Sequence, residues 1–241
     1  MWITKDYNGT ECIKASPNCD PSHNCSTTSG RTHPVPGTDQ HVSAEPHTRT
    51  VGRKRITTMT HISEVAIDLF SKQGFDDTSV DDIATAAGIA RRTVFRYYPS
   101  KNAIAWGDFD IYLDELRLLL DAIPDDLSIA DALQRALIEF NSVPGTELPR
   151  HRRRMSLLLE IPALQAHSML MYAEWRQVIA EFCARRLGVD AGAPVPQTIA
   201  WMTLGTALAA YEQWLAEPDR DLEALLIEGS RTLTEGVAAL G

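Results

Sequence analysis

The stretch that decides the fold is residues 78–101, TSVDDIATAAGIARRTVFRYYPSK. Ser79 can cap the start of a short helix, and Asp82 places a carboxylate near its positive end. Gly88 is typical of a helix end, and Pro99 stops a second short helix that follows at once. Two short helices joined by such a tight turn are typical of a helix-turn-helix.

A longer helix is predicted in front of this stretch. Apolar residues recur there at helical spacing, so that one face is apolar. These residues are Ile62, Val65, Ala66, Leu69 and Phe70. Gly74 follows them as a stop signal. The first helix therefore supports the helix-turn-helix, and together they predict a three-helix module.

The second short helix carries the chemistry of the module. At about 100° per residue, Val94 and Tyr98 face inward, while Arg92 and Arg96 point the opposite way. Arginine can bind guanine bidentately in the major groove, and hydroxyl groups suit phosphate oxygens. We therefore predict a DNA-reading face, with Lys101 added from the next helix start. It comprises Arg91, Arg92, Thr93, Phe95, Arg96, Tyr97 and Lys101. The alternative, a solvated basic surface, is disfavoured by the helix-turn-helix in front of it.

Residues 74–104, GFDDTSVDDIATAAGIARRTVFRYYPSKNAI, resemble the DNA-binding module of the TetR family of repressors. The resemblance implies that Thr57 or Thr58, at the first helix start, contacts phosphate and that six residues of this face meet DNA, namely Arg91, Arg92, Thr93, Phe95, Tyr97 and Lys101. Ala90 departs from the pattern, because many members have a capping serine there. Segments of the remaining chain resemble the TetR-type regulators encoded with the mycofactocin biosynthesis system, and this second resemblance covers roughly residues 54–240.

After Lys101 the pattern predicts helix after helix, with prolines at most of the breaks, and no useful strand pattern. The expected helices span about 102–121, 128–142, 149–160, 163–187, 195–216 and 220–239. The predicted fold is all-α and TetR-like. Its parts are a disordered tail (1–52), a helix-turn-helix DNA-binding domain (53–101) and a helical bundle for ligand binding and dimerisation (102–241).

Three of the four cysteines lie in the tail, at Cys12, Cys19 and Cys25, near His23. Their spacing matches no short-spaced zinc pattern, so a flexible reduced tail is favoured over a metal cluster. Cys183, in an apolar helical pattern, is expected in the core. We predict no cofactor and no metal.

The bundle is rich in large apolar side chains, which indicate a core and can also hold an elongated apolar ligand. The run RHRRR at 150–154 would then supply a cation for an anionic head, although a charge run is more often a solvated face. We therefore expect a small, largely apolar effector, such as a long-chain acyl-CoA. Its candidate residues are Trp106, Phe109, Phe140, Arg152, Met155, Leu159, Leu164, His167, Met171 and Trp175. For His167, a core position is the favoured alternative.

The last two predicted helices carry apolar stripes and small residues, which favour a homodimer, as the resemblance also implies. Two recognition helices would then read a near-palindromic operator with half-sites about 34–36 Å apart. The net charge of −9 is uneven, because residues 111–241 hold 19 acidic and 11 basic side chains, so the local field around the helix-turn-helix can still attract DNA.

No membrane span or secretory signal is apparent, which favours a cytoplasmic protein. Motifs of the common enzyme classes are absent. The sequence predicts a ligand-responsive transcriptional repressor, and a helical adaptor without DNA binding is the alternative.

Overall fold

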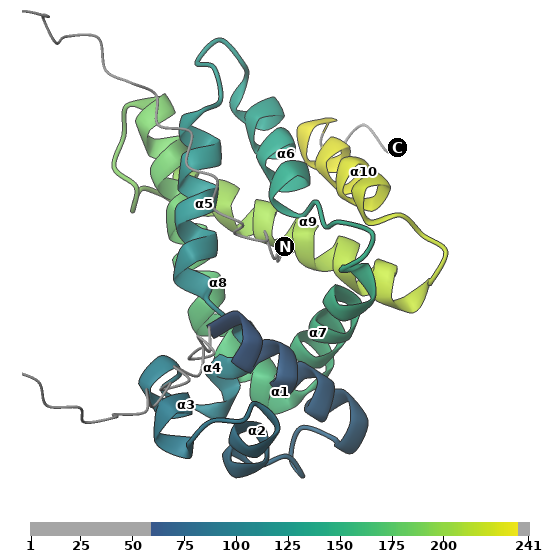
Figure 1. Ribbon diagram of the computed structural model, residues 1–241. Coiled ribbons are helices and arrows are strands. Elements are labelled where there is room, and N and C mark those ends of the chain that lie inside the picture. The colour runs from purple at the N-terminus through teal and green to yellow at the C-terminus, as the bar shows by residue number, and fades with distance from the viewer. Residues whose placement is uncertain (1–58, 236–241) are drawn as a thin grey trace, which may run out of the picture. The chain divides into compact units, whose positions relative to one another are not determined.

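A computed structural model describes residues 59–235, and these form ten α-helices without a strand (Figure 1). The all-α prediction is confirmed. In chain order the helices are α1 (Met59–Gln73), α2 (Val80–Ala86), α3 (Arg91–Tyr97), α4 (Lys101–Trp106), α5 (Phe109–Asp121), α6 (Ile129–Phe140), α7 (Leu148–Glu160), α8 (Pro162–Leu187), α9 (Pro194–Ala216) and α10 (Leu222–Glu235). None of these helices is long and apolar enough to cross a membrane. The tail, with Cys12, Cys19, Cys25 and His23, lies outside the described residues.

Helices α1, α2 and α3 form the predicted helix-turn-helix module. Ser79 and Asp82 make a reciprocal capping box, in which the Ser79 hydroxyl accepts from the Asp82 N–H at 3.1 Å and the Asp82 carboxylate accepts from the Ser79 N–H at 2.8 Å. The hydrogen bonds from Ser79 also hold the pKa of Asp82 below its usual value. Gly88 then turns the chain with φ of 69°, a conformation that favours glycine. Local signals therefore fix both ends of α2.

One predicted helix is wrong, because residues 102–121 form two helices. Gly107 separates α4 from α5 with φ of 71° and ψ of −149°, a region open almost only to glycine. The Gly107 N–H bonds the Ile104 carbonyl at 3.2 Å and so closes α4. A single glycine inside an apolar periodic stretch gives little warning of such a break.

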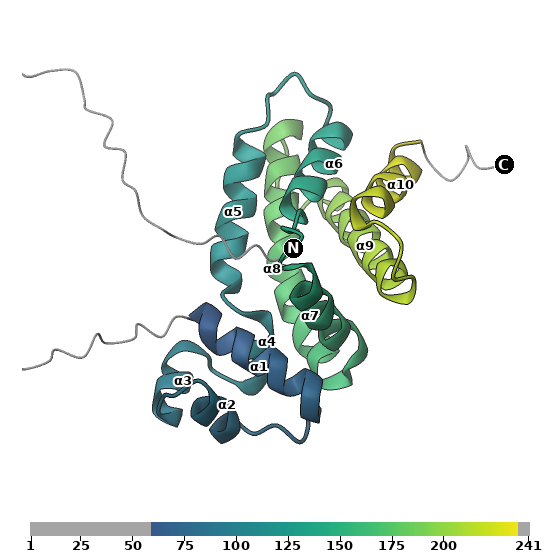
Figure 2. The same ribbon diagram turned by 45° about the vertical axis from the view of Figure 1, so that its right-hand side comes forward.

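The larger bundle is built around two long helices, α8 and α9. Helix α9 packs against α8 on one side and α10 on another, and α10 also contacts α6 (Figure 2). Helix α4 contacts α1, α7 and α8, and α1 contacts α7 as well. The predicted breaks at Pro162, Pro194 and Pro218 agree with the observed helix bounds to within a few residues. Cys183 is buried, as expected, and burial raises its pKa to about 11.

Candidate DNA interface and effector pocket

Helix α3 is held to its module by two inward residues. Val94 and Tyr98 are buried, and the Tyr98 hydroxyl donates to the Met59 carbonyl on α1 at 2.8 Å. Burial raises the pKa of this hydroxyl, so it stays a neutral donor. The opposite side of α3 is consequently fixed toward solvent.

That outer side gathers the cationic and aromatic residues predicted from the sequence. Arg91, Arg92 and Arg96 are exposed, and Phe95 is 43% exposed. The guanidinium of Arg91 pairs with Asp81 at 2.7 Å and lies over the Phe95 ring, whereas Arg96 lies over the Tyr97 ring. Thr93 and Tyr97 are half-buried at the edge of this surface.

Lys101 has a different environment from the arginines. Its Nζ donates to the carbonyls of Phe75 at 2.8 Å and Thr78 at 3.1 Å, and it lies 4.2 Å from the Phe75 ring centre. Two of its three N–H groups therefore hold the turn before α2. Thr57 and Thr58 lie outside the described residues.

A central apolar pocket lies among α4, α5, α7, α8 and α9. Its lining includes four of the predicted effector residues, Trp106, Phe109, Met155 and Trp175. Sequence reasoning missed the rest, which are Tyr172, Leu204, Ala207, Leu208 and Tyr211. In this conformation the open space amounts to only about 20 Å³, roughly enough for one water molecule. The Trp106 ring packs edge-on against Phe109 at 5.2 Å and Tyr172 at 5.6 Å between ring centres.

The other six predicted effector residues do not line this pocket. Phe140 and Leu164 are buried in the core, Leu159 and Met171 are partly buried against it, and burial lowers the pKa of the half-buried His167. Arg152 donates to the Trp214 carbonyl and stacks over the Trp214 ring at 4.5 Å. Its charge therefore faces the C-terminal end of α9, which is the negative end of the helix dipole.

The neighbouring arginines of the RHRRR run are also occupied within the chain. Arg150 pairs with Glu64 at 2.8 Å and Glu147 at 3.0 Å, and Arg153 pairs with Asp68 at 3.2 Å. The run therefore joins α7 to α1, and its arginines do not form a free cationic cluster beside the pocket.

Arg154 extends this junction into the interior. It is 6% exposed, and its Nη2 donates to the Ser63 hydroxyl of α1 at 3.1 Å, while Ser63 donates to the Ile104 carbonyl of α4 at 2.7 Å. Burial lowers the pKa of Arg154, and a hydrogen bond with Tyr112 opposes that shift. Within the described residues Arg154 forms no ion pair at salt-bridge distance, so its direct hydrogen bonds to Ser63 and Tyr112 are to hydroxyl groups, and the Glu64 carboxylate acts on the charge from farther away.

A second buried polar chain was not foreseen from the sequence. The Tyr211 hydroxyl lies 2.9 Å from His151 Nε2 and donates to Asn141 Oδ1 at 2.9 Å, so that it connects α7, α9 and α6. Burial, with the charge of Arg154 nearby, holds the pKa of His151 well below its usual value. His151 is therefore neutral in the folded protein.

Comparison with known proteins gives matches over most of the chain. A family model described as tetR-family bacterial regulatory proteins matches residues 62–105, and one described as the MftR C-terminal domain matches residues 127–238. The chain is 56% identical over 181 residues to a protein of Mycobacterium tuberculosis named as the mycofactocin biosynthesis transcriptional regulator MftR, which covers 75% of this chain and 91% of the relative.

Solved structures share the fold at low identity. The fatty acid degradation regulator FadR from Bacillus halodurans has a TM-score of 0.54 and 18% identity, covering 74% of this chain and 95% of that one. The regulator FadR from Bacillus subtilis, solved with stearoyl-CoA, has a TM-score of 0.50 and 16% identity, covering 74% and 98%. At these identities the likeness shows the fold alone.

Proposed function

The chain belongs to the TetR family of bacterial transcriptional regulators, and from this premise we propose that it is a dimeric repressor released from its operator by a long-chain acyl-CoA. Members of this family are regulators and not enzymes, so the function to explain is the recognition of DNA and of a ligand. The proposal that the protein binds DNA rests on the outer side of α3, where three exposed arginines face away from the buried Val94 and Tyr98.

We assign separate roles to the residues of this side. Arg92 and Arg96 read base edges, because each guanidinium is exposed and neither forms an ion pair within the described residues. Thr93 and Tyr97 at the edge of α3 contact phosphate, with Thr57 and Thr58 at the predicted first helix start. Arg91 and Phe95 border the groove, with Arg91 held in place by Asp81.

Lys101 is assigned to the module's structure, because it binds two carbonyls before α2. We place the DNA-binding domain at residues 53–101 and the effector and dimerisation domain at 102–241, with DNA binding in the cytoplasm.

We assign pairing of two subunits to α9 and α10. Gly205 and Ala209 are exposed along α9, and a shallow groove between α9 and α10 is lined by these residues and by Gly229. Small side chains let two helices approach closely, as a four-helix interface between subunits requires. The resulting two-fold symmetry calls for a near-palindromic operator.

The effector part of the proposal rests on the central pocket. Its lining is apolar and aromatic, as an acyl chain requires, and a protein of the same fold has been solved with stearoyl-CoA. In this conformation the pocket has open space for only about one water molecule, so an entering acyl chain must push the lining side chains apart. Ligand binding therefore selects an expanded state, and its effect on DNA binding is limited by its differential affinity for the two states.

The experiment is a gel shift at stated salt with DNA from upstream of the protein's own coding region. Arg92→Ala should weaken operator binding by about 1–3 kcal/mol for each half-site, roughly 5- to 150-fold per half-site, because one bidentate base contact is lost in each. Arg117→Ala is the matched control, because Arg117 is an exposed arginine on α5 whose partner is the neighbouring Asp114. Stearoyl-CoA should release the DNA, and coenzyme A alone should not. Equal binding by both variants would remove the DNA assignment, and release by coenzyme A alone would remove the effector assignment.

A further inference from the structure

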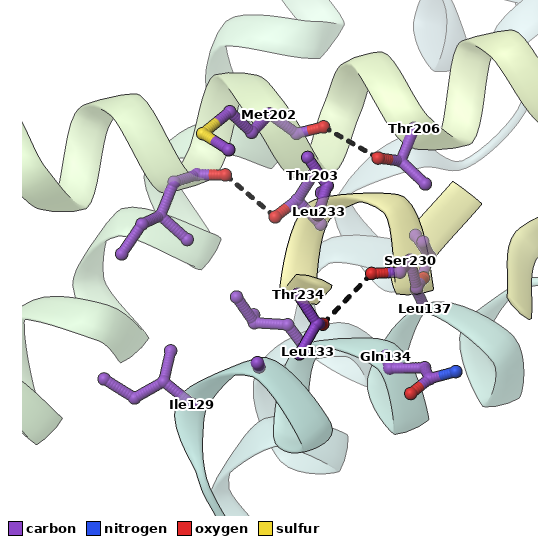
Figure 3. Close-up of a pocket in the computed structure, with 12 residues that line it drawn as sticks. Ile129, Leu133, Gln134, Leu137, Met202, Thr203, Thr206, Ser230, Leu233 and Thr234 are labelled. Atoms are coloured by element: carbon purple, nitrogen blue, oxygen red, sulfur yellow. Dashed lines mark hydrogen bonds between the residues drawn. The ribbon is translucent and has the colours of Figure 1, made fainter. Parts of the chain in front are cut away.

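A second cavity, separate from the central pocket, lies between α6, α9 and α10 (Figure 3). Its open volume is about 260 Å³, some thirteen times that of the central pocket. The two cavities share no lining residue. The lining of the larger one comprises Ile129, Ala130, Leu133, Gln134, Leu137, Ile199, Met202, Thr203, Thr206, Ser230, Leu233 and Thr234.

The lining of this cavity carries no charge and so disfavours an anionic head group. None of the twelve residues is an arginine, lysine, histidine, aspartate or glutamate. A carboxylate or phosphate in this site would lose hydration without gaining a cationic partner, because the Gln134 amide and the Ser230 hydroxyl are neutral donors. The cavity therefore suits a neutral molecule, in contrast to the acyl-CoA proposed for the central pocket.

The hydroxyl groups of the lining set the polarity of the ligand. Thr203 donates to the Ile199 carbonyl at 2.8 Å, Thr206 to the Met202 carbonyl at 3.0 Å, and Thr234 to the Ser230 carbonyl at 3.0 Å (Figure 3). Each of these hydroxyls donates its only hydrogen to a carbonyl of its own helix, so only its oxygen lone pairs remain available to a ligand. The three threonines therefore offer acceptors, and a ligand that carries a donor complements them.

The volume sets the size. An engineered apolar cavity of about 150 Å³ accepts benzene, so about 260 Å³ admits a molecule of one or two fused rings. We propose that the α6–α9–α10 cavity is a second ligand site for a compact, neutral, largely apolar molecule that carries one hydroxyl or N–H donor, such as a phenol.

The site lies next to the surface that we assign to subunit pairing. Met202, Thr206 and Leu233 line the cavity and also line the groove between α9 and α10 that we assign to subunit pairing. A molecule in the cavity would contact both α9 and α10, the two helices of the proposed pairing surface. The site itself, however, depends on neither the operator nor the acyl-CoA proposal.

The test uses the full chain and three probes of one size: 1-naphthol, naphthalene and 1-naphthoate. We expect 1-naphthol to bind most tightly by fluorescence titration, naphthalene more weakly, and 1-naphthoate weakest of all. One of the two variants Thr203→Val and Thr206→Val, the one that removes the threonine accepting the single O–H, should weaken 1-naphthol by about two- to tenfold, the effect of one neutral hydrogen bond, and neither should change naphthalene binding. Thr198→Val is the matched control, because Thr198 is an exposed threonine of α9 outside the lining.

Ala130→Phe fills the cavity from α6 and should abolish binding of both neutral probes, while thermal unfolding of each variant shows whether it still folds. Equal binding of 1-naphthoate, absence of 1-naphthol binding, or unchanged 1-naphthol binding by a folded Ala130→Phe variant would overturn the proposal. Because the readout is probe binding without DNA, it is independent of whether the protein is released from its operator by acyl-CoA.

Discussion

The link from Arg154 through Ser63 to the Ile104 carbonyl makes an asymmetric prediction about stability. Replacing Ser63 by Ala removes a partner from a buried charge, whereas replacing Arg154 by Met removes the charge itself. A buried charge left without its partner is costly, but replacing the charge with an apolar side chain of similar volume is often close to neutral. We therefore expect Ser63→Ala to destabilise the fold more than Arg154→Met.

The magnitudes follow from the contacts. Ser63→Ala loses one bond to a charged donor, worth about 1.5–3 kcal/mol, and one neutral bond to Ile104, worth about 0.5–1.5 kcal/mol. The Ile104 carbonyl keeps the Gly107 N–H as a donor, so the expected total lies near the lower half of that sum, about 2–3 kcal/mol. With Met at position 154, Ser63→Ala should cost only the neutral bond, about 1 kcal/mol.

The assay is a double-mutant cycle by urea unfolding at one fixed protein concentration, since the apparent stability of the proposed dimer would depend on concentration. The expected coupling energy is about 1–2 kcal/mol. A functional readout accompanies it, because the link crosses from α7 to α1 and α4. Arg154→Met should bind the operator but respond less to stearoyl-CoA. Additive free energies, with Arg154→Met costing as much as Ser63→Ala, would refute the reasoning.

Three further predictions concern α3, the buried histidine and the proposed pairing surface. Ala90, the residue before α3, has φ of −78° and ψ of 146° but no capping side chain, so Ala90→Ser should add about 1 kcal/mol of unfolding free energy and tighten operator binding, whereas Ala86→Ser inside α2 should not. Because the pKa of His151 is depressed in the folded protein, the unfolded chain takes up a proton below about pH 6.5 at a pH where the folded protein does not. The free energy of unfolding, measured with urea, should therefore be highest above that pH and fall by up to about 1.4 kcal/mol per pH unit as the pH drops. His151→Gln should flatten this slope. A methyl group at Gly205 meets no atom within 4 Å in the single chain, so Gly205→Ala should weaken dimerisation in sedimentation without unfolding the subunit; an unchanged dimer would count against pairing through α9.

The helix-turn-helix could be predicted from the sequence because its signals are local. The Ser79–Asp82 capping box, Gly88 and Pro99 each act on residues close by in the chain, so the helix ends that they cause can be recognised from the local sequence. The break at Gly107 was missed because its cause is not local: the glycine conformation serves a turn that lies against Ser63, whose hydroxyl is 3.5 Å from the position a Cβ would take.

The effector pocket could be predicted only in part for the same reason. Helices α8 and α9 carry apolar residues all round, so periodicity does not tell which side faces the cavity. The contacts of the arginines at 150–154 could not be predicted, because Arg150 binds Glu64, 86 residues earlier in the chain, and Arg152 binds the Trp214 carbonyl, 62 residues later. Such pairings exist only after folding.

The central pocket and the junction between α7 and α1 both involve α4. Trp106, at one end of α4, lines the pocket, and Lys101, at the other end, binds the turn before α2. Helix α4 is thus a short connection between the central pocket, where we propose that an acyl chain binds, and the module that carries α3. Arg154 restrains this connection through Ser63 and Ile104, on α1 and α4. Opening the pocket without moving the module would strain these bonds, so we expect binding of the proposed effector to displace α3.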